Sequence, residues 1–459
     1  MKKLITSLVF SLLILMACVS PILADGANVA LDLTEMQRYE MASSLCWIDD
    51  YLYVLGNKGV YSWKSGSEKM NTVIDLTAAF NYDYVQDCPE DESEAAVWNQ
   101  MLQLIFTDGE ALYGLHPYSG MIKKIEGNEQ TDVAEIQQEY LYSEDMEAYR
   151  DIRQAVYADK KLYLLLGTDT YEEYDKTELY AFDLDTSEME LVDIEGVNSI
   201  MLGAEGALLI QTNDALSGVA QYDVESGTLG EEILTVGEDE RIAGVAWDAV
   251  DQRYVRFVQG QVVTCDADGN EIVKAYIPIF DATENVPAAC SATGLYALAN
   301  GRYIFIRDIT GDEAASQTIL TVAGYLNPDM LIQFSLDNPD IAVLQSSQSA
   351  QNAALSGDYT VDMFTLTAPG DFAAMKEKGY LASMQDGQLR DWSKTLYQEI
   401  QNVIYSGEEL LAAPIAINVN SWTMDETMWN ELELGEYPTN YDELFEKIAV
   451  WLDDYASEY

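Results

Sequence analysis

The chain has 459 residues, 48% of them hydrophobic and 11% aromatic, which is enough apolar material for real cores and argues against a disordered protein. Its 24 basic residues face 79 acidic ones, so the formal net charge is -55. A chain of this charge is repelled by phosphate backbones and anionic lipids, which excludes nucleic acid as a partner. We interpret the acidity as a solubility device of an exported protein, with a calcium-binding surface as the alternative.

The N-terminus predicts an export signal over residues 1–24. Two lysines precede an apolar run at residues 4–16, which is too short to span a bilayer. Two processing routes stay open. Leu-Met-Ala-Cys resembles a bacterial lipobox in which Cys18 would be lipidated, whereas Ile-Leu-Ala at 22–24 fits a signal-peptidase site. Either route predicts an extracytoplasmic protein, secreted or lipid-anchored to the outer face of the cell membrane.

Residues 25–310 predict a β-propeller-like domain. Polar turns such as Asp49-Asp50 precede short alternating strands, and each strand carries an aromatic or aliphatic anchor. The anchors recur at spacings of about 45 to 60, as expected for four-stranded blades. They are Tyr53, Tyr113, Tyr163, Leu209, Val255 and Ile304. We predict six blades, with seven as the alternative. The sixth unit lacks an outer strand, which the early strand at residues 28–33 would supply, closing the ring and removing its exposed edges.

The propeller sequence offers little chemistry. The only histidine, His116, stands beside a proline in a turn and is predicted to be loop surface, which leaves no Ser-His-Asp triad or His-ligated metal. The acidic stretch at residues 265–271 favours a hairpin turn over a calcium loop. Four cysteines beyond Cys18 permit three pairings, which stay open. They are Cys46, Cys88, Cys265 and Cys290. We therefore predict no enzyme, no metal and no cofactor.

A short polar linker at 311–317 precedes a second domain, 318–459, in which apolar strands alternate with amphipathic helices. This order predicts a parallel sheet with crossover helices. Helix one starts at Asn327-Pro328-Asp329, with Met330, Leu331, Phe334 and Leu336 as its buried face. The later elements are predicted as strands at 341–344, 361–366 and 410–420, and as helices at 369–378, 389–404 and 441–455. A capping box from Thr439 to Asp442 is predicted to open the last helix.

The motifs of this domain resemble the first lobe of an extracellular solute-binding protein of the sugar-binding class that serves ABC importers. The resemblance covers about the last third of the chain. Its motifs lie, in the family's order, at 325–329, 337–343, 361–364, 378–382 and 413–416 leading to Trp422. It implies an α/β periplasmic-binding-protein-like lobe. The chain stops at Tyr459, shortly after a second lobe would begin, so the lobe is expected to be truncated, either as a fragment or by degeneration.

The candidate ligand-binding residues follow from the sheet. Side chains alternate along a strand, so Asn418, Asn420 and Trp422 would share one face, and amides beside an indole suit a neutral sugar. Residues after the earlier strands would reach the same edge, namely Tyr325, Thr365 and Thr367. The resemblance implies that such positions line a ligand cleft.

The leading hypothesis is a receptor that binds a sugar or oligosaccharide and delivers it to an ABC permease in the membrane. The alternative is a surface adhesion or scaffold protein whose propeller binds a glycan or peptide.

Overall fold

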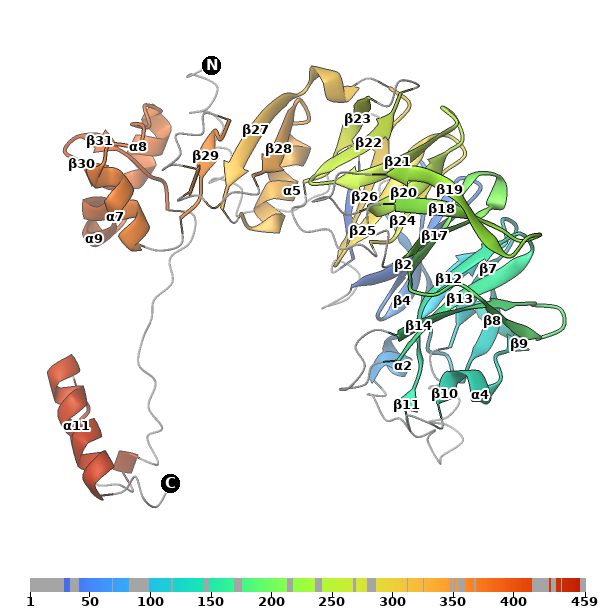
Figure 1. Ribbon diagram of the computed structural model, residues 1–459. Helices are drawn as coiled ribbons and strands as arrows, with labels where there is room; N and C mark the ends of the chain where they lie inside the picture. Colours follow the sequence, from blue (N-terminus) through green and yellow to red (C-terminus); the bar gives the residue numbers. More distant parts are fainter. Residues whose placement is uncertain are drawn as a thin grey trace. The chain divides into compact units, whose positions relative to one another are not determined.

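The computed structural model describes most of the chain after the N-terminal segment. The described residues are 29–33, 41–67, 69–81, 99–116, 119–143, 148–168, 176–212, 218–235, 242–266, 270–278, 286–311, 313–324, 326–346, 349, 352–353, 360–366, 369–414, 429–430, 435–438 and 440–454. They belong to two compact units, Met1–Ala382 and Ser383–Tyr459. The first contains a propeller followed by a small parallel sheet, and the second contains helices and a hairpin (Figure 1).

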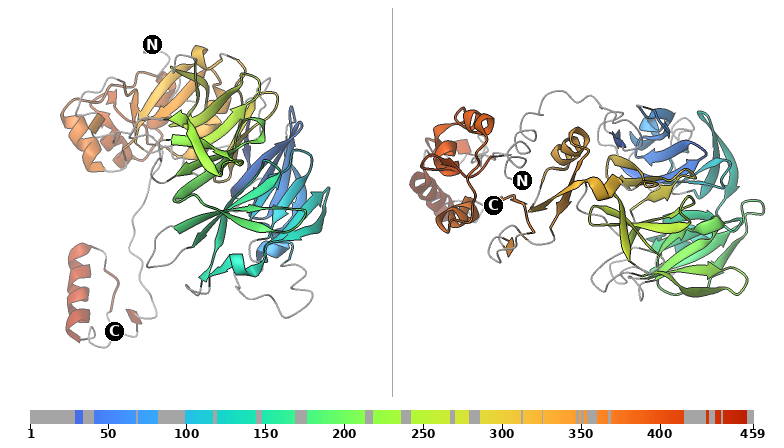
Figure 2. Two further views of the ribbon diagram at one scale, coloured as in Figure 1. Left: turned by 45° about the vertical axis from the view of Figure 1, so that its right-hand side comes forward. Right: turned by 90° about the horizontal axis from the view of Figure 1, so that it is seen from above.

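Six four-stranded antiparallel sheets form the propeller, as predicted, and five of them are built from strands that follow one another along the chain (Figure 2). Blade 1 is β2 (Ala42–Ile48), β3 (Tyr51–Gly56), β4 (Gly59–Lys64) and β5 (Asn71–Asp75), and blade 2 is β6 (Leu104–Thr107), β7 (Leu112–Leu115), β8 (Met121–Glu126) and β9 (Glu129–Glu135). Blade 3 is β12 (Asp151–Ala158), β13 (Lys161–Thr168), β14 (Lys176–Phe182) and β15 (Met189–Val192). Blade 4 is β16 (Val197–Leu202), β17 (Leu208–Thr212), β18 (Gly218–Asp223) and β19 (Thr228–Thr235), and blade 5 is β20 (Ala243–Asp248), β21 (Arg253–Val258), β22 (Gln261–Cys265) and β23 (Glu271–Tyr276). Short elements in the connections are α2 (Thr77–Asn81), α4 (Gln138–Leu141), β10 (Tyr142–Ser143), β11 (Ala148–Tyr149) and η2 (Ala204–Gly206).

The sixth blade closes the ring with a strand from the start of the chain. It contains β24 (Ala288–Cys290), β25 (Leu295–Asn300) and β26 (Tyr303–Asp308), and its outer strand is β1 (Val29–Asp32), antiparallel to β26. The predicted closure by the early strand is confirmed. The predicted alignment of the sixth unit is wrong by one strand, because Ile304 lies in the third strand whereas the other anchors lie in second strands. The first strand, β24, has only three residues, too few to give a recognisable pattern.

The cores of the propeller lie between neighbouring blades. One cluster joins Leu52 and Trp63 of blade 1 to Ala297 and Ile304 of blade 6, and all four are at most 1% exposed. Other clusters join blade 2 to blade 3 and blade 3 to blade 4 in the same way. Each blade thus covers the apolar face of the next, and the inner strands contact one another around the whole ring, from β2 through β6, β12, β16 and β20 to β24.

A buried arginine holds the closing strand. Arg307 on β26 donates to the carbonyl oxygens of Val29 on β1, Tyr276 on blade 5 and Ile306, each at 2.9 Å. Its side chain also lies over the ring of Phe305, 5.8 Å from the centroid. Burial lowers the pKa of the guanidinium to about 10. The Arg307 side chain therefore links β1 in the closing blade to the last strand of blade 5.

The chain leaves the ring through η4 (Glu313–Ser316) and enters a three-stranded parallel sheet. Its elements are β27 (Thr318–Ala323), α5 (Pro328–Asp337), β28 (Ile341–Gln345) and β29 (Met363–Phe364), followed by α7 (Pro369–Glu377). The strand order is β28-β27-β29, all parallel. Within the described residues, the structure does not show the predicted periplasmic-binding-protein-like lobe beyond this sheet and its helices. Helix α5 starts after Asn327 as predicted, and the Asn327 side chain accepts a hydrogen bond from the Asp329 N–H at 2.9 Å.

The buried face of α5 differs from the predicted one. Leu331, Ile332 and Phe334 are at most 6% exposed, whereas Met330 and Leu336 are only half-buried. Ile332, which the prediction omits, packs in the core of blade 6. The periodicity indicated one buried stripe, but α5 faces both the sheet and the ring.

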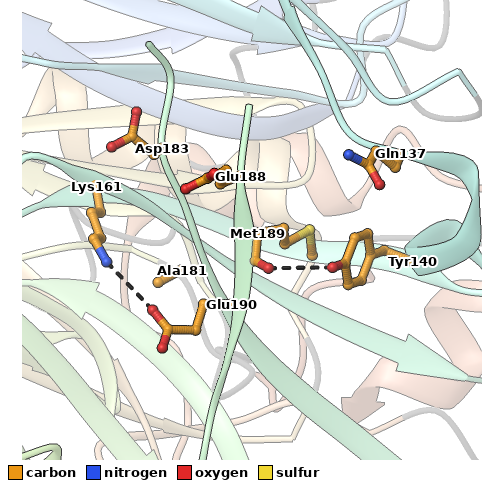
Figure 3. Close-up of a pocket in the computed structure, with 8 residues that line it drawn as sticks. All are labelled: Gln137, Tyr140, Lys161, Ala181, Asp183, Glu188, Met189 and Glu190. Carbon is orange, nitrogen blue, oxygen red and sulfur yellow. Dashed lines mark hydrogen bonds and ion pairs between the residues drawn. The ribbon is translucent and has the colours of Figure 1, made fainter. Parts of the chain in front are cut away.

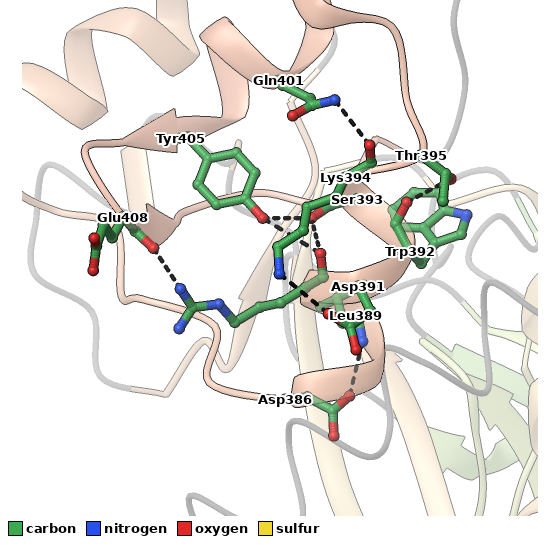
Figure 4. A network of polar contacts seen from close by, with 11 residues as sticks. Asp386, Leu389, Asp391, Trp392, Ser393, Lys394, Thr395, Gln401, Tyr405 and Glu408 are labelled. Carbon is green, nitrogen blue, oxygen red and sulfur yellow. Dashed lines mark hydrogen bonds and ion pairs between the residues drawn. The ribbon is translucent and has the colours of Figure 1, made fainter.

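The second unit contains α8 (Gly387–Ser393), α9 (Gln398–Ile404), the hairpin β30 (Tyr405–Ser406) with β31 (Glu409–Leu410), and α11 (Tyr441–Asp454). The helix predicted over 389–404 is wrong, because the chain breaks between α8 and α9 (Figure 4). A side chain takes two carbonyl groups that a continuous helix would use. Gln401 Nε2 donates to Lys394 O at 3.1 Å and to Leu396 O at 2.7 Å.

One further prediction in this unit is corrected and another is confirmed. The strand predicted over 410–420 stops at Leu410, where β31 pairs with β30, and residues 411–414 form no strand. The remaining residues, 415–420, lie outside the described part of the chain. The predicted helix over 441–455 is confirmed as α11. Thr439 of the predicted capping box lies outside the described residues, and the Asn440 side chain accepts from the Glu443 N–H at 3.0 Å.

Sequence predictions about the propeller's polar residues have mixed outcomes. His116 is fully buried, so its assignment to loop surface is wrong. Its Nδ1 accepts from the Ser119 N–H at 3.0 Å and thereby holds the turn.

Cys46, Cys265 and Cys290 are free thiols, and Cys18 and Cys88 lie outside the described residues. No described helix is both long and apolar enough to cross a membrane.

Candidate functional site

The carboxyl ends of the three parallel strands form the candidate site. The chain passes from β27 to β28 on one side and then from β28 to β29 on the other side of β27, so the direction of winding changes between β27 and β29. In open parallel sheets ligands bind outside the carboxyl ends of the strands at such a switch point. The segments that follow β27 and β29 therefore define where a ligand would meet this sheet.

These two segments touch at a glycine. Gly324 follows β27 with φ +96°, and a Cβ built on it would overlap the carbonyl oxygen and side chain of Thr365, which follows β29. The Thr365 N–H donates to Ala323 O at 2.8 Å, and its hydroxyl lies 3.5 Å from the same oxygen. Only glycine fits both the backbone conformation and the close approach.

The third strand contributes an amide to the same edge. Gln345, the last residue of β28, donates from Nε2 to Gly324 O at 3.0 Å. The next residue, Ser346, donates its N–H to Val322 O at 2.8 Å. An amide, a hydroxyl and backbone groups from three strands thus gather at one edge, and a ligand with hydroxyl groups could bind such groups through directed hydrogen bonds.

An apolar cluster supports this edge. Ala323 and Ala353 are fully buried and Val361 is 8% exposed, with Phe364 and Leu366 packed against them. Small residues let the segments before and after β29 lie close to β27. The polar groups at the edge consequently rest on a packed base.

The charges near the edge disfavour an anionic ligand. Helix α7 follows β29 and carries Asp371 in its first turn, whereas Asp329, in the first turn of α5, is paired with Arg302. A helix N-terminus attracts anions through its partial positive charge, but a carboxylate in the first turn already offsets that charge. The Asp362 carboxylate adds a further negative charge and accepts from the Thr321 N–H at 2.9 Å.

The structure describes one of the predicted ligand-binding residues. Thr365 lies at the switch point, half-buried, as expected for a residue at the end of the third strand. The others lie outside the described residues. They are Tyr325, Thr367, Asn418, Asn420 and Trp422. Sequence reasoning missed Gly324 and Gln345, although an Ala-Gly pair directly after an apolar strand signals a close approach of backbones.

A second concave region lies on the propeller, beside α4 and blade 3 (Figure 3). It encloses about 360 Å³ and combines one lysine with three carboxylates, an amide, a phenol and two small or apolar groups. Its lining residues are Gln137, Tyr140, Lys161, Ala181, Asp183, Glu188, Met189 and Glu190. The Tyr140 hydroxyl donates to Met189 O at 3.3 Å, and Lys161 Nζ lies 3.8 Å from Glu190. Several polar groups are thus already paired within the wall.

A metal-binding cluster is absent from what the structure describes. No group of three or more His, Cys, Asp or Glu side chains among the described residues is placed to hold a metal ion. Burial raises the pKa of the Cys46 thiol to about 12, and burial with nearby Asp248 does the same for Cys290. Asp266, in the segment weighed as a calcium loop, instead pairs with Asn270 across the hairpin turn.

Comparison with known proteins leaves the family open. No family model matches the sequence, and no curated protein matches it. Among solved structures, the chain is similar to a protein of unknown function from Bacteroides thetaiotaomicron, at 12% identity and a TM-score of 0.40 over 61% of this chain and 72% of that one. It is also similar to a gluconolactonase from Xanthomonas campestris (11%, 0.41, 63% and 97%) and to a streptogramin B lyase (11%, 0.34, 61% and 97%). TM-scores this low carry no argument, so the propeller assignment rests on the strand pairings.

Proposed function

We propose that this chain is a binding protein without catalytic activity, which takes a small uncharged polar ligand at the carboxyl edge of β27, β28 and β29. A carbohydrate is the ligand class we infer. The contact of Gly324 with Thr365 at the switch point carries the proposal, because it builds a polar edge where parallel sheets bind their ligands. The acidic first turn of α7 supports a neutral ligand over a phosphate or carboxylate.

The resemblance to sugar-binding receptors of ABC importers extends this proposal to transport. In that reading an exported or lipid-anchored chain captures a sugar or oligosaccharide outside the cytoplasm and delivers it to a membrane permease. Uptake of labelled sugar by cells with and without the gene measures this step. Equal uptake by the two strains would remove the transport role while leaving ligand binding intact.

Binding itself is tested by calorimetry and thermal shift on the full chain with a panel of mono- and oligosaccharides. At a ligand concentration of 100 times Kd the folded state gains about 2.7 kcal/mol, enough for a clear rise in Tm. Two variants test the proposed edge, Thr365→Val and Trp422→Ala. We expect both to weaken binding, because the first removes the described hydroxyl and the second the predicted stacking surface.

The matched control is Thr72→Val, which makes the same exchange at an exposed position of β5 on the propeller. It should bind as the parent does. Sugar binding that survives Thr365→Val and Trp422→Ala together would disprove the proposed site.

The groove beside α4 supports a second candidate function, adhesion through a glycan or peptide bound by the propeller. A glycan or peptide bound there would contact the exposed Glu188 and the ring of Tyr140. Binding that is lost in Glu188→Gln and unchanged in Thr365→Val would favour adhesion through the propeller. The opposite pattern would favour the receptor.

A further inference from the structure

The strand that closes the ring is covered by the crossover helix of the parallel sheet. Helix α5 contacts β1, and its Ile332, 6% exposed, belongs to the apolar core of blades 5 and 6 together with Tyr296 and Phe305. Ala30 of β1 and Leu336 of α5 pack against the same core. The outer strand of the closing blade thus has β26 at its edge and α5 against its face.

A single guanidinium bridges the two elements. Arg302 lies in the turn between β25 and β26, with Nε 3.6 Å from the Asp32 carboxylate on β1 and Nη2 2.5 Å from the Asp329 carboxylate on α5. Its plane lies over the ring of Tyr303, 4.7 Å from the centroid, and the Tyr303 hydroxyl is hydrogen-bonded to Asp329. The Leu33 N–H, directly after β1, donates to Arg302 O at 2.9 Å. One turn of the ring therefore binds both the end of β1 and the start of α5.

The same helix positions the candidate site. Helix α5 begins four residues after Gly324 and connects β27 to β28, so a shift of α5 would move the sheet edge where a ligand would bind. Helix α5 packs against both blade 6 and the parallel sheet, so its position must be compatible with both contacts. Displacing it from blade 6 would remove the cover of β1, and loosening β1 would remove part of the surface that holds α5.

We propose that α5 couples the pairing of β1 in the propeller to the conformation of the β27–β29 sheet. Arg302 and Ile332 are the residues that carry this coupling. Because coupling between two sites is reciprocal, weakening either end must loosen the other. This coupling is separate from ligand binding and does not depend on which ligand the sheet edge binds. The competing explanation is that β26 and Arg307 alone hold β1, in which case α5 is a passive neighbour.

Hydrogen exchange measured by mass spectrometry on the full chain separates the two explanations, and no ligand is needed. In Arg302→Gln and in Ile332→Ala we expect the amides of β1 and of α5 to exchange together, at least tenfold faster than in the parent. Blades 2, 3 and 4 should keep their exchange rates. Lys161→Gln is the matched control. It removes a cation of similar exposure, 37% against 34% for Arg302, from a pair within blade 3, and it should change neither β1 nor α5.

The reciprocal variant changes the strand instead of the helix. Ala30→Gly weakens β1 while Arg302 and Ile332 themselves stay unchanged in sequence. We expect this variant to accelerate hydrogen exchange in α5 as well. Faster exchange of α5 with an unchanged β1 in Ile332→Ala, or of β1 with an unchanged α5 in Ala30→Gly, would overturn the proposal. If Ile332→Ala unfolds the whole first unit, Ile332→Val gives the same comparison with a smaller cavity.

Discussion

Blade 4 and blade 6 have the same four-stranded sheet but are assembled in different ways. Blade 4 is one continuous stretch, and its last hairpin is closed by Asp223, whose carboxylate accepts the N–H groups of Glu225 and Ser226 at 2.9 and 3.2 Å. Blade 6 takes its last strand from the other end of the ring, where no turn can bring β1 to β26. The bonds of Arg307 replace that turn, and one of them joins residues 278 positions apart. Local turn chemistry is sufficient for blade 4, whereas blade 6 depends on buried side chains.

The largest effect should come from removing the arginine that closes the ring. Arg307→Met removes three hydrogen bonds to backbone carbonyl groups, two of them buried, and we expect it to lower the free energy of unfolding by about 3 kcal/mol. Denaturant titration followed by tryptophan fluorescence measures this change. Arg253→Met, in a blade closed by its own hairpin, should cost less than about 0.5 kcal/mol, because its bond to Cys265 O is long and exposed. Equal losses in the two variants would show that the closing blade needs no special bond.

A smaller effect, confined to the parallel sheet, should follow from Gly324→Ala. The new Cβ would overlap Thr365 at a backbone angle that alanine adopts poorly, and we expect about 2 kcal/mol of strain. Gly127→Ala is the control, since Gly127 also has a positive φ (61°) but no atom within 4 Å of an added Cβ. The difference between the variants isolates the close approach. Hydrogen exchange should rise in β27 and β29 while blades 2 to 4 stay protected, and a uniform rise would contradict the assignment.

The smallest effect concerns the pH dependence of Tm. It tests how much the local turn at Asp223 stabilises blade 4, in contrast to the long-range bonds that close blade 6. Hydrogen bonds that the Ser226 side chain, the Ser226 N–H and the Glu225 N–H donate to the Asp223 carboxylate lower its pKa below the ordinary 3.8. Because the folded-state pKa is the lower one, the stabilisation is present above pH 3.8 and is lost as pH falls through the folded value. Asp223→Asn should therefore flatten the decline of Tm between about pH 5 and pH 2. An unchanged slope would show that this turn contributes nothing.

The same contrast explains which parts of the fold could be predicted. Turns such as Asp49-Asp50 and anchors such as Tyr163 are local signals, so five blades were recoverable from the sequence. The role of the early strand was inferred from the need to close an edge. The alignment of the sixth unit failed, because β24 is too short to show alternation and the turn after Asn300 imitates the turns that precede second strands.

Other errors arose where side chains override periodicity. The apolar spacing over 389–404 fits one helix, but the Gln401 side chain binds the Lys394 and Leu396 carbonyl groups at the break, which the apolar period does not predict. His116 looked like a surface residue because its neighbours form a turn, yet its ring nitrogen holds that turn from the inside. At the candidate site, strand order placed Thr365 correctly. The roles of Gly324 and Gln345 depend on contacts between strands that are distant in the sequence.

The origin of β1 also sets an order of events in synthesis. The strand is made first, but its partner β26 and its donor Arg307 are made almost last among the elements of the ring. Until then the strand has no edge to join, so completing the circle is a late step governed by a very long loop closure. In the interval the newly made blades expose apolar flanks and two unpaired edges to other nascent chains. Aggregation during expression is thus the characteristic hazard of this architecture.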